Sequence, residues 1–197
     1  MEQYTQTNNE NILEGQLREC FGRVVYSHKT HEKCTDILLS RSATIKLWQI
    51  GLSSLTGAGF IAAIFGKGQI AGLLGIIVST ILIALNTYTK DYDLGELAQK
   101  HKQAANELWL IREEYLSLLT DLKTGRTLLE DILKKRDELL QKLHTVYSGA
   151  PSTTFKAYRK AQDALQKKEE LTFSDAEIDT FLPNDLKREN VQVNHRV

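Results

Sequence analysis

The chain is poor in cysteine and has no excess charge of either sign. It has only two cysteines among 197 residues. Cys20 and Cys34 lie on one predicted helix, about 21 Å apart at 1.5 Å of rise per residue, which is too far for a disulfide. We interpret both as reduced cytoplasmic thiols. Basic and acidic residues balance at 25 each. Because no segment carries a one-sided basic run, we expect no direct binding to nucleic acid.

The sequence also lacks any arrangement of residues that supports catalysis. It has no phosphate-binding glycine loop, no Ser-His-Asp or Cys-His pattern, and no carboxylate pair that stands apart from solvated helix faces. We therefore expect no enzyme activity and no cofactor. His28, His31 and Cys34 are spaced at threes and could approach one metal ion, but zinc needs further ligands that this stretch does not offer. They fit a helix–helix interface better, and His101 fits a core position, so no metal site is predicted.

Two long apolar stretches without a charged residue are the dominant feature of the chain. Leu47–Phe65 and Gln69–Tyr88 are separated only by Gly66-Lys67-Gly68. Their lengths correspond to roughly 28–30 Å of helix, which matches the hydrocarbon thickness of a bilayer. A soluble protein can bury one apolar core helix, but two in succession are hard to explain that way. The sequence predicts an all-α membrane protein with a two-helix transmembrane hairpin.

The distribution of basic residues predicts the orientation of this hairpin. Seven lysines and arginines lie within 20 residues outside the two spans, whereas the turn carries only Lys67. This asymmetry favours both termini in the cytoplasm. The first 43 residues show no basic segment followed by an apolar one. We therefore expect no cleavable signal peptide and interpret the first span as an uncleaved insertion signal.

The remainder of the chain is predicted to be polar helix with disordered ends. Before the first span, apolar or semi-polar residues recur at spacings of three and four and define one helix face: Leu13, Leu17, Phe21, Val24, His28, His31, Thr35 and Leu38. No proline separates this helix from the membrane, so it can continue into the first span. The predicted segments are a disordered 1–11, a juxtamembrane helix 12–43, transmembrane helices 44–65 and 69–89, cytoplasmic helices 92–148, C-terminal helices 152–186, and a disordered tail 187–197.

Two series of heptad positions follow the second span and predict a helical bundle or a coiled-coil-like arrangement. One series contains Leu94, His101, Leu108, Tyr115, Leu122, Leu129, Arg136 and Leu143; the other contains Leu97, Ala104, Ile111, Leu118, Gly125, Ile132, Leu139 and Val146. Leu119, Leu133 and Leu140 widen this stripe, which suits a bundle better than a two-stranded seam.

Gly125 leaves two arrangements open for this region. Glycine is common just past a helix end, and Thr127 with Glu130 could form a capping box, so we favour a turn and a folded-back second half. The alternative is one uninterrupted rod. Farther on, Gly149-Ala150-Pro151 breaks the pattern, and a helix is predicted over about Thr154–Glu170, with Phe155, Tyr158, Ala161 and Leu165 on one face. Ser174 and Glu177 indicate a second capping box before Pro183.

The apolar spans contain two candidate functional faces. Gly68, Gly72, Gly75 and Ser79 form a ridge of small residues on the second span, and Gly51, Ser54, Ala58 and Ala62 do the same on the first. Such ridges allow helix backbones to approach closely, either within the hairpin or between hairpins. Gln49, Ser53 and Thr56 place polar groups on one face of the first span. This face could line a pore or could make interhelical hydrogen bonds.

The layout resembles the SLATT family of bacterial two-span proteins, and the resemblance covers residues 12–186. The residues that carry it are His31-Glu-Lys-Cys-Thr-Asp36, Gln49-Ile-Gly-Leu-Ser53, Gly57-Ala-Gly-Phe60, Leu97-Ala-Gln-Lys-His101, Leu108-Trp-Leu-Ile-Arg112, Tyr115-Leu-Ser-Leu-Leu-Thr-Asp-Leu122, Lys135-Arg-Asp137, Ala150-Pro151, Lys156-Ala-Tyr158 and Phe173-Ser-Asp-Ala-Glu-Ile-Asp179. These motifs are typical of a family but indicate no particular chemistry.

What the resemblance implies is an effector of a bacterial conflict or antiphage system. Such an effector would sit in the inner membrane, form homo-oligomers, and perforate or depolarise that membrane. The resemblance also implies a neighbouring reverse transcriptase or nucleotide-second-messenger system, and the subgroup that this chain looks like is the one associated with reverse transcriptases. The alternative function is a non-conducting, membrane-anchored helical scaffold that recruits a signalling partner.

Overall fold

The protein is all-helical in the part of the chain that the structure describes. The computed structural model describes residues 2–65 and 69–188, and these contain no β-strand. The helices are α1 (Glu2–Phe65), α2 (Gln69–Asp91), α3 (Leu94–Thr124), α4 (Leu129–Gly149), α5 (Phe155–Gln166) and α6 (Asp175–Phe181), followed by the 3₁₀ helix η1 (Asn184–Leu186). The fold class predicted from the sequence, an all-α membrane-type protein, is confirmed.

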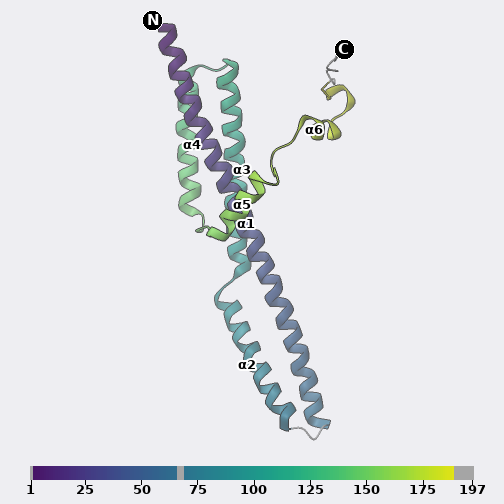
Figure 1. Cartoon of the computed structure of the whole chain (residues 1–197). Helices are drawn as coiled ribbons and strands as arrows, with labels where there is room; N and C mark the ends of the chain where they lie inside the picture. Colours follow the sequence, from purple (N-terminus) through teal and green to yellow (C-terminus); the bar gives the residue numbers. More distant parts are fainter. Residues whose placement is uncertain (1, 66–68, 189–197) are drawn as a thin grey trace.

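One helix, α1, runs through both halves of the molecule (Figure 1). Its 64 residues correspond to about 96 Å of length. It begins at Glu2, so residues 2–11 are helical and the disorder predicted for this stretch is wrong. The physical reason is that Leu13 and Leu17 are buried in the bundle, and a helix anchored there extends backwards at little further cost. No proline interrupts α1 before the membrane.

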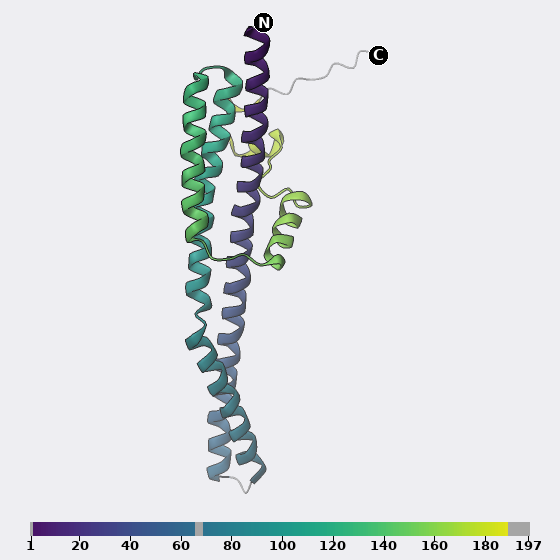
Figure 2. The same ribbon diagram turned by 90° about the vertical axis from the view of Figure 1, so that its left-hand side faces the viewer.

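The N-terminal half of α1 packs with α3 and α4 as a three-helix bundle (Figure 2). Its core consists of the buried residues Leu13, Leu17, Val24, Leu108, Ile111, Tyr115, Leu118, Ile132, Leu139 and Val146. The predicted face of α1 is therefore confirmed, as are most of the predicted heptad positions. Leu97 and Leu140 are exceptions, because their side chains are 38% and 56% exposed. At about 1.5–3 kcal/mol for each large apolar side chain, burial of this core holds the three helices together.

The turn at Gly125 is confirmed, so α4 folds back along α3. Gly125 has a φ of 64°, a left-handed conformation that glycine adopts without strain, and its N–H donates to the Leu122 carbonyl. The predicted capping box at Thr127 is wrong. The residue that caps α4 is Leu128, which has extended backbone angles and makes no side-chain capping bond. Thr127 lies one position too early for its hydroxyl to serve as the cap.

The C-terminal helices differ in part from the expectation. Thr154 caps α5, which ends at Gln166 rather than Glu170. On the predicted apolar face, Phe155 and Tyr158 are 74% and 44% exposed. Ala161 of that face is buried against α1 together with Ala157 and Ala164, because small side chains permit a close approach of the two helices. The capping box of Ser174 with Glu177 at the start of α6 is confirmed.

The second half of α1 and the whole of α2 form a long hairpin that projects from the bundle (Figure 1). The turn Gly66-Lys67-Gly68 lies outside the described residues. In the described part of the chain one apolar window passes the length and composition test for a membrane span. It lies within Gly72–Thr124, has a mean hydropathy of 1.7, and no part of it is buried inside the protein. Apolar side chains are equally exposed along α1: Leu47, Ile50, Leu55 and Ile61 are 56–70% exposed.

Candidate functional site

The candidate site is the hairpin together with its junction to the bundle. Along α1, the partly buried positions are spaced at fours and threes, so they form the stripe that faces α2: Ile45, Gln49, Leu52, Thr56 and Gly59. The positions between them are mostly exposed. Among the described elements, α2 is the helix that lies along this part of α1 (Figure 1), so this stripe is the contact surface within the hairpin and the exposed side of α1 is available to lipid or to other chains.

Gln49 makes the polar contacts that join the two hairpin helices. Its side-chain amide donates to the Asn86 Oδ1 at 2.9 Å and to the Thr89 hydroxyl at 3.2 Å. An amide in an apolar span is costly unless it is hydrogen-bonded, so these bonds fix the register of α1 against α2.

Asn86 is not among the residues predicted from the sequence, although the sequence contains the necessary signal. Gln49 lies 18 residues before Lys67 at the predicted turn, and Asn86 lies 19 residues after it. In an antiparallel hairpin with a tight turn, the two residues must therefore reach the same level.

The three residues predicted to line a pore do not all face the same way in this structure. Gln49 and Thr56 lie in the stripe toward α2, and the Thr56 hydroxyl donates to the Leu52 carbonyl of its own helix at 2.8 Å. Ser53 is exposed. Ser53 is about 40° around the helix from Gln49. One part of this polar face therefore contacts α2, and the part with Ser53 lies just outside that contact. Its role as a pore lining stays a prediction.

Among the residues that the structure describes, the ridge of small residues on α2 makes no close contact at Gly72 and Gly75. A Cβ atom added at either glycine would meet no described atom within 4 Å. Ser79 on the same ridge is half-buried, and Gly68 lies outside the described residues. Gly51 on α1 is equally open. The two described glycines of the ridge therefore do not hold this hairpin together, and they leave a surface on which another helix can approach closely.

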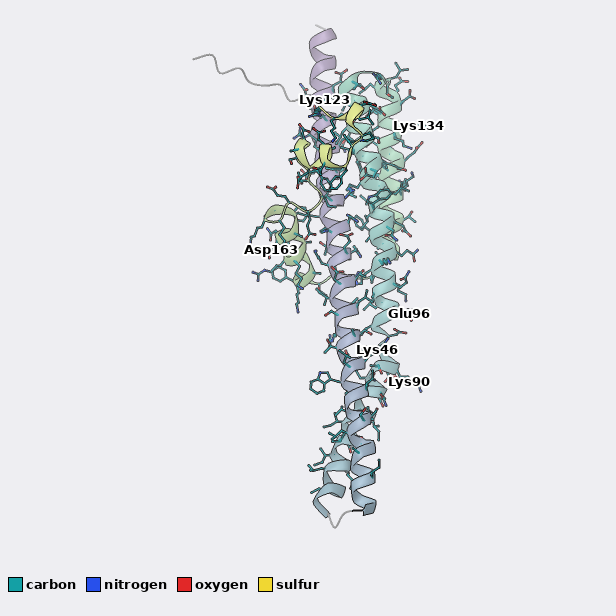
Figure 3. The ribbon with its side chains drawn as sticks, turned by 90° about the vertical axis from the view of Figure 1, so that its right-hand side faces the viewer. Lys46, Lys90, Glu96, Lys123, Lys134 and Asp163 are labelled. Atoms are coloured by element: carbon teal, nitrogen blue, oxygen red, sulfur yellow. The ribbon has the colours of Figure 1, made fainter. Side chains whose placement is uncertain are left out.

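Aromatic and basic side chains gather where the hairpin joins the bundle. The Arg41 guanidinium lies over the Tyr88 ring at 5.9 Å, and Tyr88 stacks on Tyr92 with ring centroids 5.1 Å apart. Lys46 and Lys90 lie at similar heights on α1 and α2 (Figure 3). Such side chains are typical of the membrane–water interface. This arrangement supports a membrane boundary close to Lys46 and Lys90.

The two hairpin helices enter the bundle differently. α1 continues without a break, whereas α2 ends at Asp91 and α3 begins at Leu94. Asp93 caps α3, and its carboxylate accepts from the Gly95 and Glu96 N–H groups at 2.9 Å. The hairpin is thus connected to the bundle by one unbroken helix, α1, and by a break between two helices at the α2–α3 junction.

The histidines of α1 lie at an interface, as the sequence predicted. His31 on α1 and His101 on α3 are both buried, and their Nδ1 atoms are 2.9 Å apart. Burial lowers the pKa of both rings; together with the neighbouring His101 and His28 it brings the pKa of His31 to about 4. No cluster of three or more metal-ligating side chains occurs in the part of the chain that the structure describes. Cys34 is buried nearby as a free thiol.

Comparison with known proteins identifies the family. Neither the curated proteins nor the solved structures gave a match to the chain. A family model described as "SMODS and SLOG-associating 2TM effector domain family 4" matches residues 13–177. This range includes the three-helix bundle, the hairpin and α5, so the match covers the whole candidate site. The chain therefore belongs to this SLATT family of two-transmembrane effector domains.

Proposed function

We propose that this protein is the membrane effector of a bacterial conflict or antiphage system, and that on activation it oligomerises and forms a pore or otherwise depolarises the inner membrane. The family membership supports the effector role. The observation that carries the mechanism is the continuity of α1. A single helix connects the bundle core at Leu17 with the apolar hairpin at Ile61, so a movement of α1 in the cytoplasm is transmitted directly into the membrane.

The proposed topology places both termini and the whole of the bundle in the cytoplasm. The seven-to-one basic asymmetry and the position of Lys46 and Lys90 at one end of the hairpin support it. A reporter fused to the C-terminus should be active only if it is a cytoplasmic reporter. Activity of a periplasmic reporter at that position would reverse the orientation.

In the proposed mechanism, the hairpins of several copies associate through the ridge of Gly72, Gly75 and Ser79, with Gly68 at its end. The polar face of Gln49, Ser53 and Thr56 then lines the water-filled path. In the single chain, Gln49 is engaged by Asn86 and Thr89, so that path is closed. Opening requires α1 to rotate against α2 until this face leaves its partners, which would be a shift between two populated states.

The activating signal is proposed to come from a system encoded nearby. The matched family is described as SMODS- and SLOG-associating. A nucleotide-second-messenger system is therefore one candidate source of the signal, and a reverse transcriptase, which the sequence resemblance implied, is the other. The proposal assigns no enzyme activity and no cofactor to the chain itself.

The alternative is a membrane-anchored scaffold that recruits a partner and conducts nothing. The extensive exposed surface of the bundle is compatible with that role. Expression in bacteria together with a membrane-potential dye separates the two functions. The effector should cause loss of membrane potential and growth arrest when its neighbouring system is triggered. A scaffold should leave the membrane potential unchanged under the same trigger, and that result would contradict our proposal.

A further inference from the structure

A segment after α4 crosses the bundle and binds α1 from outside. We call residues 150–170 the strap; it contains the linker 150–154, α5 and the turn 167–170. Figure 2 shows it passing from the end of α4 to the opposite side of α1. Three alanines of α5 are almost completely buried against α1, namely Ala157, Ala161 and Ala164. The strap therefore joins the α3–α4 hairpin to the helix that enters the membrane.

Aromatic and hydrogen-bonding contacts hold the middle of the strap. The rings of Tyr26 on α1 and Tyr158 on α5 stack with centroids 5.9 Å apart. The Gln166 amide donates to the Tyr26 hydroxyl at 2.6 Å. Beside them lies a cavity of about 310 Å³ that the linker residues Pro151 and Ser152 partly cover. These contacts are polar and partly open, so they form a weaker attachment than the apolar core of the bundle.

The end of the strap is held by an ion pair with a buried lysine. The Lys29 ammonium lies 2.6 Å from Glu170 and 2.9 Å from Glu32, and the side chain of Lys29 is only 9% exposed. Lys33 adds a second contact to Glu170 at 3.2 Å. Burial alone would lower the pKa of Lys29, but its bonds to Glu170 and Glu32 outweigh this and raise it. A buried ammonium is strongly destabilised when one partner is removed, so Glu170 matters beyond an ordinary surface ion pair.

The backbone around Glu170 is strained. Glu169 has a φ of 52° and Leu171 a φ of 79°, and these are the positive φ values of non-glycine residues in the described chain. Side chains disfavour this conformation, and it persists where surrounding contacts impose it. Here the two strained residues flank the carboxylate that reaches Lys29 and Lys33. Two backbone hydrogen bonds, from the Glu170 N–H to the Ala164 carbonyl and from the Thr172 N–H to the Glu169 carbonyl, hold this turn together with the ion pair.

From this arrangement we propose that the strap is an autoinhibitory latch on α1, released when Glu170 leaves Lys29 and Lys33. The strap is a second attachment of α1, added to the apolar core that α1 shares with α3 and α4. It lies at the level of Lys33, about 20 Å from Lys46 at the membrane boundary. Once the strap is released, the apolar core still holds α1, and α1 can shift along α3 within that core because α2 and α3 are separate helices. This inference rests on the proposed effector function for its consequence in the membrane, but not for the latch itself.

The test compares Glu170→Gln with Glu169→Gln in the full-length protein in detergent. Glu169 is the adjacent exposed carboxylate, and it takes part in no ion pair among the residues described. Hydrogen exchange followed by mass spectrometry should show at least tenfold faster exchange over residues 155–170 in Glu170→Gln, with the core peptides around Leu139 unchanged. Glu169→Gln should exchange as the unaltered protein does. Equal exchange in both variants would overturn the latch.

A second readout keeps the latch distinguishable from the pore. In cells without the triggering system, Glu170→Gln should increase crosslinking between copies and lower the membrane potential, whereas Glu169→Gln should do neither. Increased crosslinking with an unchanged membrane potential would support the latch, and it would contradict the proposed pore but not the latch. A freed strap without increased crosslinking would overturn the inhibitory role. If Glu170→Gln fails to fold, Lys33→Gln removes the more exposed cation and should give the same effects in weaker form.

Discussion

The Nδ1 atoms of His31 and His101 face one another at 2.9 Å inside the bundle, one on the helix that continues into the membrane and the other on α3. A hydrogen bond at this distance requires one ring to donate from Nδ1 and the other to accept. Two imidazolium rings cannot satisfy this geometry. The contact therefore depends on at least one neutral histidine, and it lies within one helical turn of Lys29 and Lys33, which hold the strap.

We predict that acidification destabilises the bundle through these histidines. Burial brings the pKa of His31 to about 4, below the ordinary 6.5, and lowers the pKa of His101 and of the neighbouring His28 as well. In the unfolded chain these histidines bind a proton near pH 6.5, whereas in the folded chain they bind it at a lower pH. The free energy of unfolding therefore falls as the pH decreases from 6.5 toward 4. For His31 alone, the loss by pH 5 is roughly 2 kcal/mol. Thermal unfolding of the detergent-solubilised protein at pH 7.5 and 5 measures it.

A matched pair of variants checks the assignment of this pH dependence. His31→Gln should weaken the dependence of the melting temperature on pH, because the group that titrates is removed. His144→Gln changes an exposed histidine on α4 and should leave the dependence as it is. If the two variants behave alike, the buried histidine pair is not the source of the effect.

The buried core could be predicted from the sequence because the spacing of apolar residues along a helix marks the face that is buried. The spacing of Leu13, Leu17 and Val24 defines one face of α1 wherever the helix packs, and Gly125 has a glycine-specific conformation that marks a turn in any context. The same local arguments failed at Phe155 and Leu140, which are large and apolar yet exposed. Whether such residues are covered depends on which helix lies opposite, and periodicity does not determine that.

The polar contacts of the site could be predicted only in part. The hydrogen bond of Gln49 with Asn86 follows from the predicted hairpin and its short turn, so it could have been predicted from the sequence. The contact of Glu170 with Lys29 joins residues 141 positions apart through two left-handed backbone angles at Glu169 and Leu171. Ordinary propensities disfavour those angles, and no local pattern indicates them. Such long-range polar contacts arise only from the folded arrangement.

We predict that Gln49 and Asn86 are energetically coupled in the hairpin. Gln49→Leu and Asn86→Leu should each weaken the association of α1 with α2, and the double variant should cost less than the sum of both. The expected coupling energy is about 1 kcal/mol, as for interhelical hydrogen bonds in membranes. Unfolding of the purified protein by sodium dodecyl sulfate in mixed micelles provides the measurement.

Thr87→Val supplies the control for this cycle. The Thr87 hydroxyl donates to the Ile83 carbonyl of its own helix at 3.0 Å and does not reach α1. Its substitution should therefore show no coupling with Gln49→Leu. A coupling energy for Gln49 with Asn86 no larger than that for Gln49 with Thr87 would mean that the amide pair does not hold the register.

We predict that the ridge on α2 is an interface between copies of the chain. Gly72→Leu should disrupt oligomers, because the branched side chain blocks the close approach of another helix. A Cβ atom at this position meets no atom within 4 Å in the described part of the chain, so the substitution should leave the hairpin itself intact. Leu74→Phe is the control, since Leu74 is exposed and lies about 200° around the helix from Gly72. Crosslinking in membranes should show the oligomer ladder lost in the first variant and kept in the second.

The final prediction concerns Ser53 and tests whether water reaches the polar face of α1 after activation. In a background lacking Cys20 and Cys34, a Ser53→Cys variant should react with a small water-soluble thiol reagent only after activation. In the closed chain Ser53 is exposed on an apolar helix, so in the proposed topology lipid rather than water surrounds it. A thiol in lipid does not ionise and stays unreactive. Reaction rates before and after the trigger give the measurement.

A second substitution at the same position tests conduction. Ser53→Leu should abolish the loss of membrane potential while the protein remains inserted and oligomeric, because a hydrophobic constriction resists wetting. In a non-conducting scaffold, Ser53→Leu would change packing by on the order of 1 kcal/mol and nothing else. If cells depolarise while the Ser53→Cys thiol stays unreactive, the lining assignment is wrong. The water-filled path would then have to run along α2, where Thr80, Asn86 and Thr87 carry exposed polar side chains.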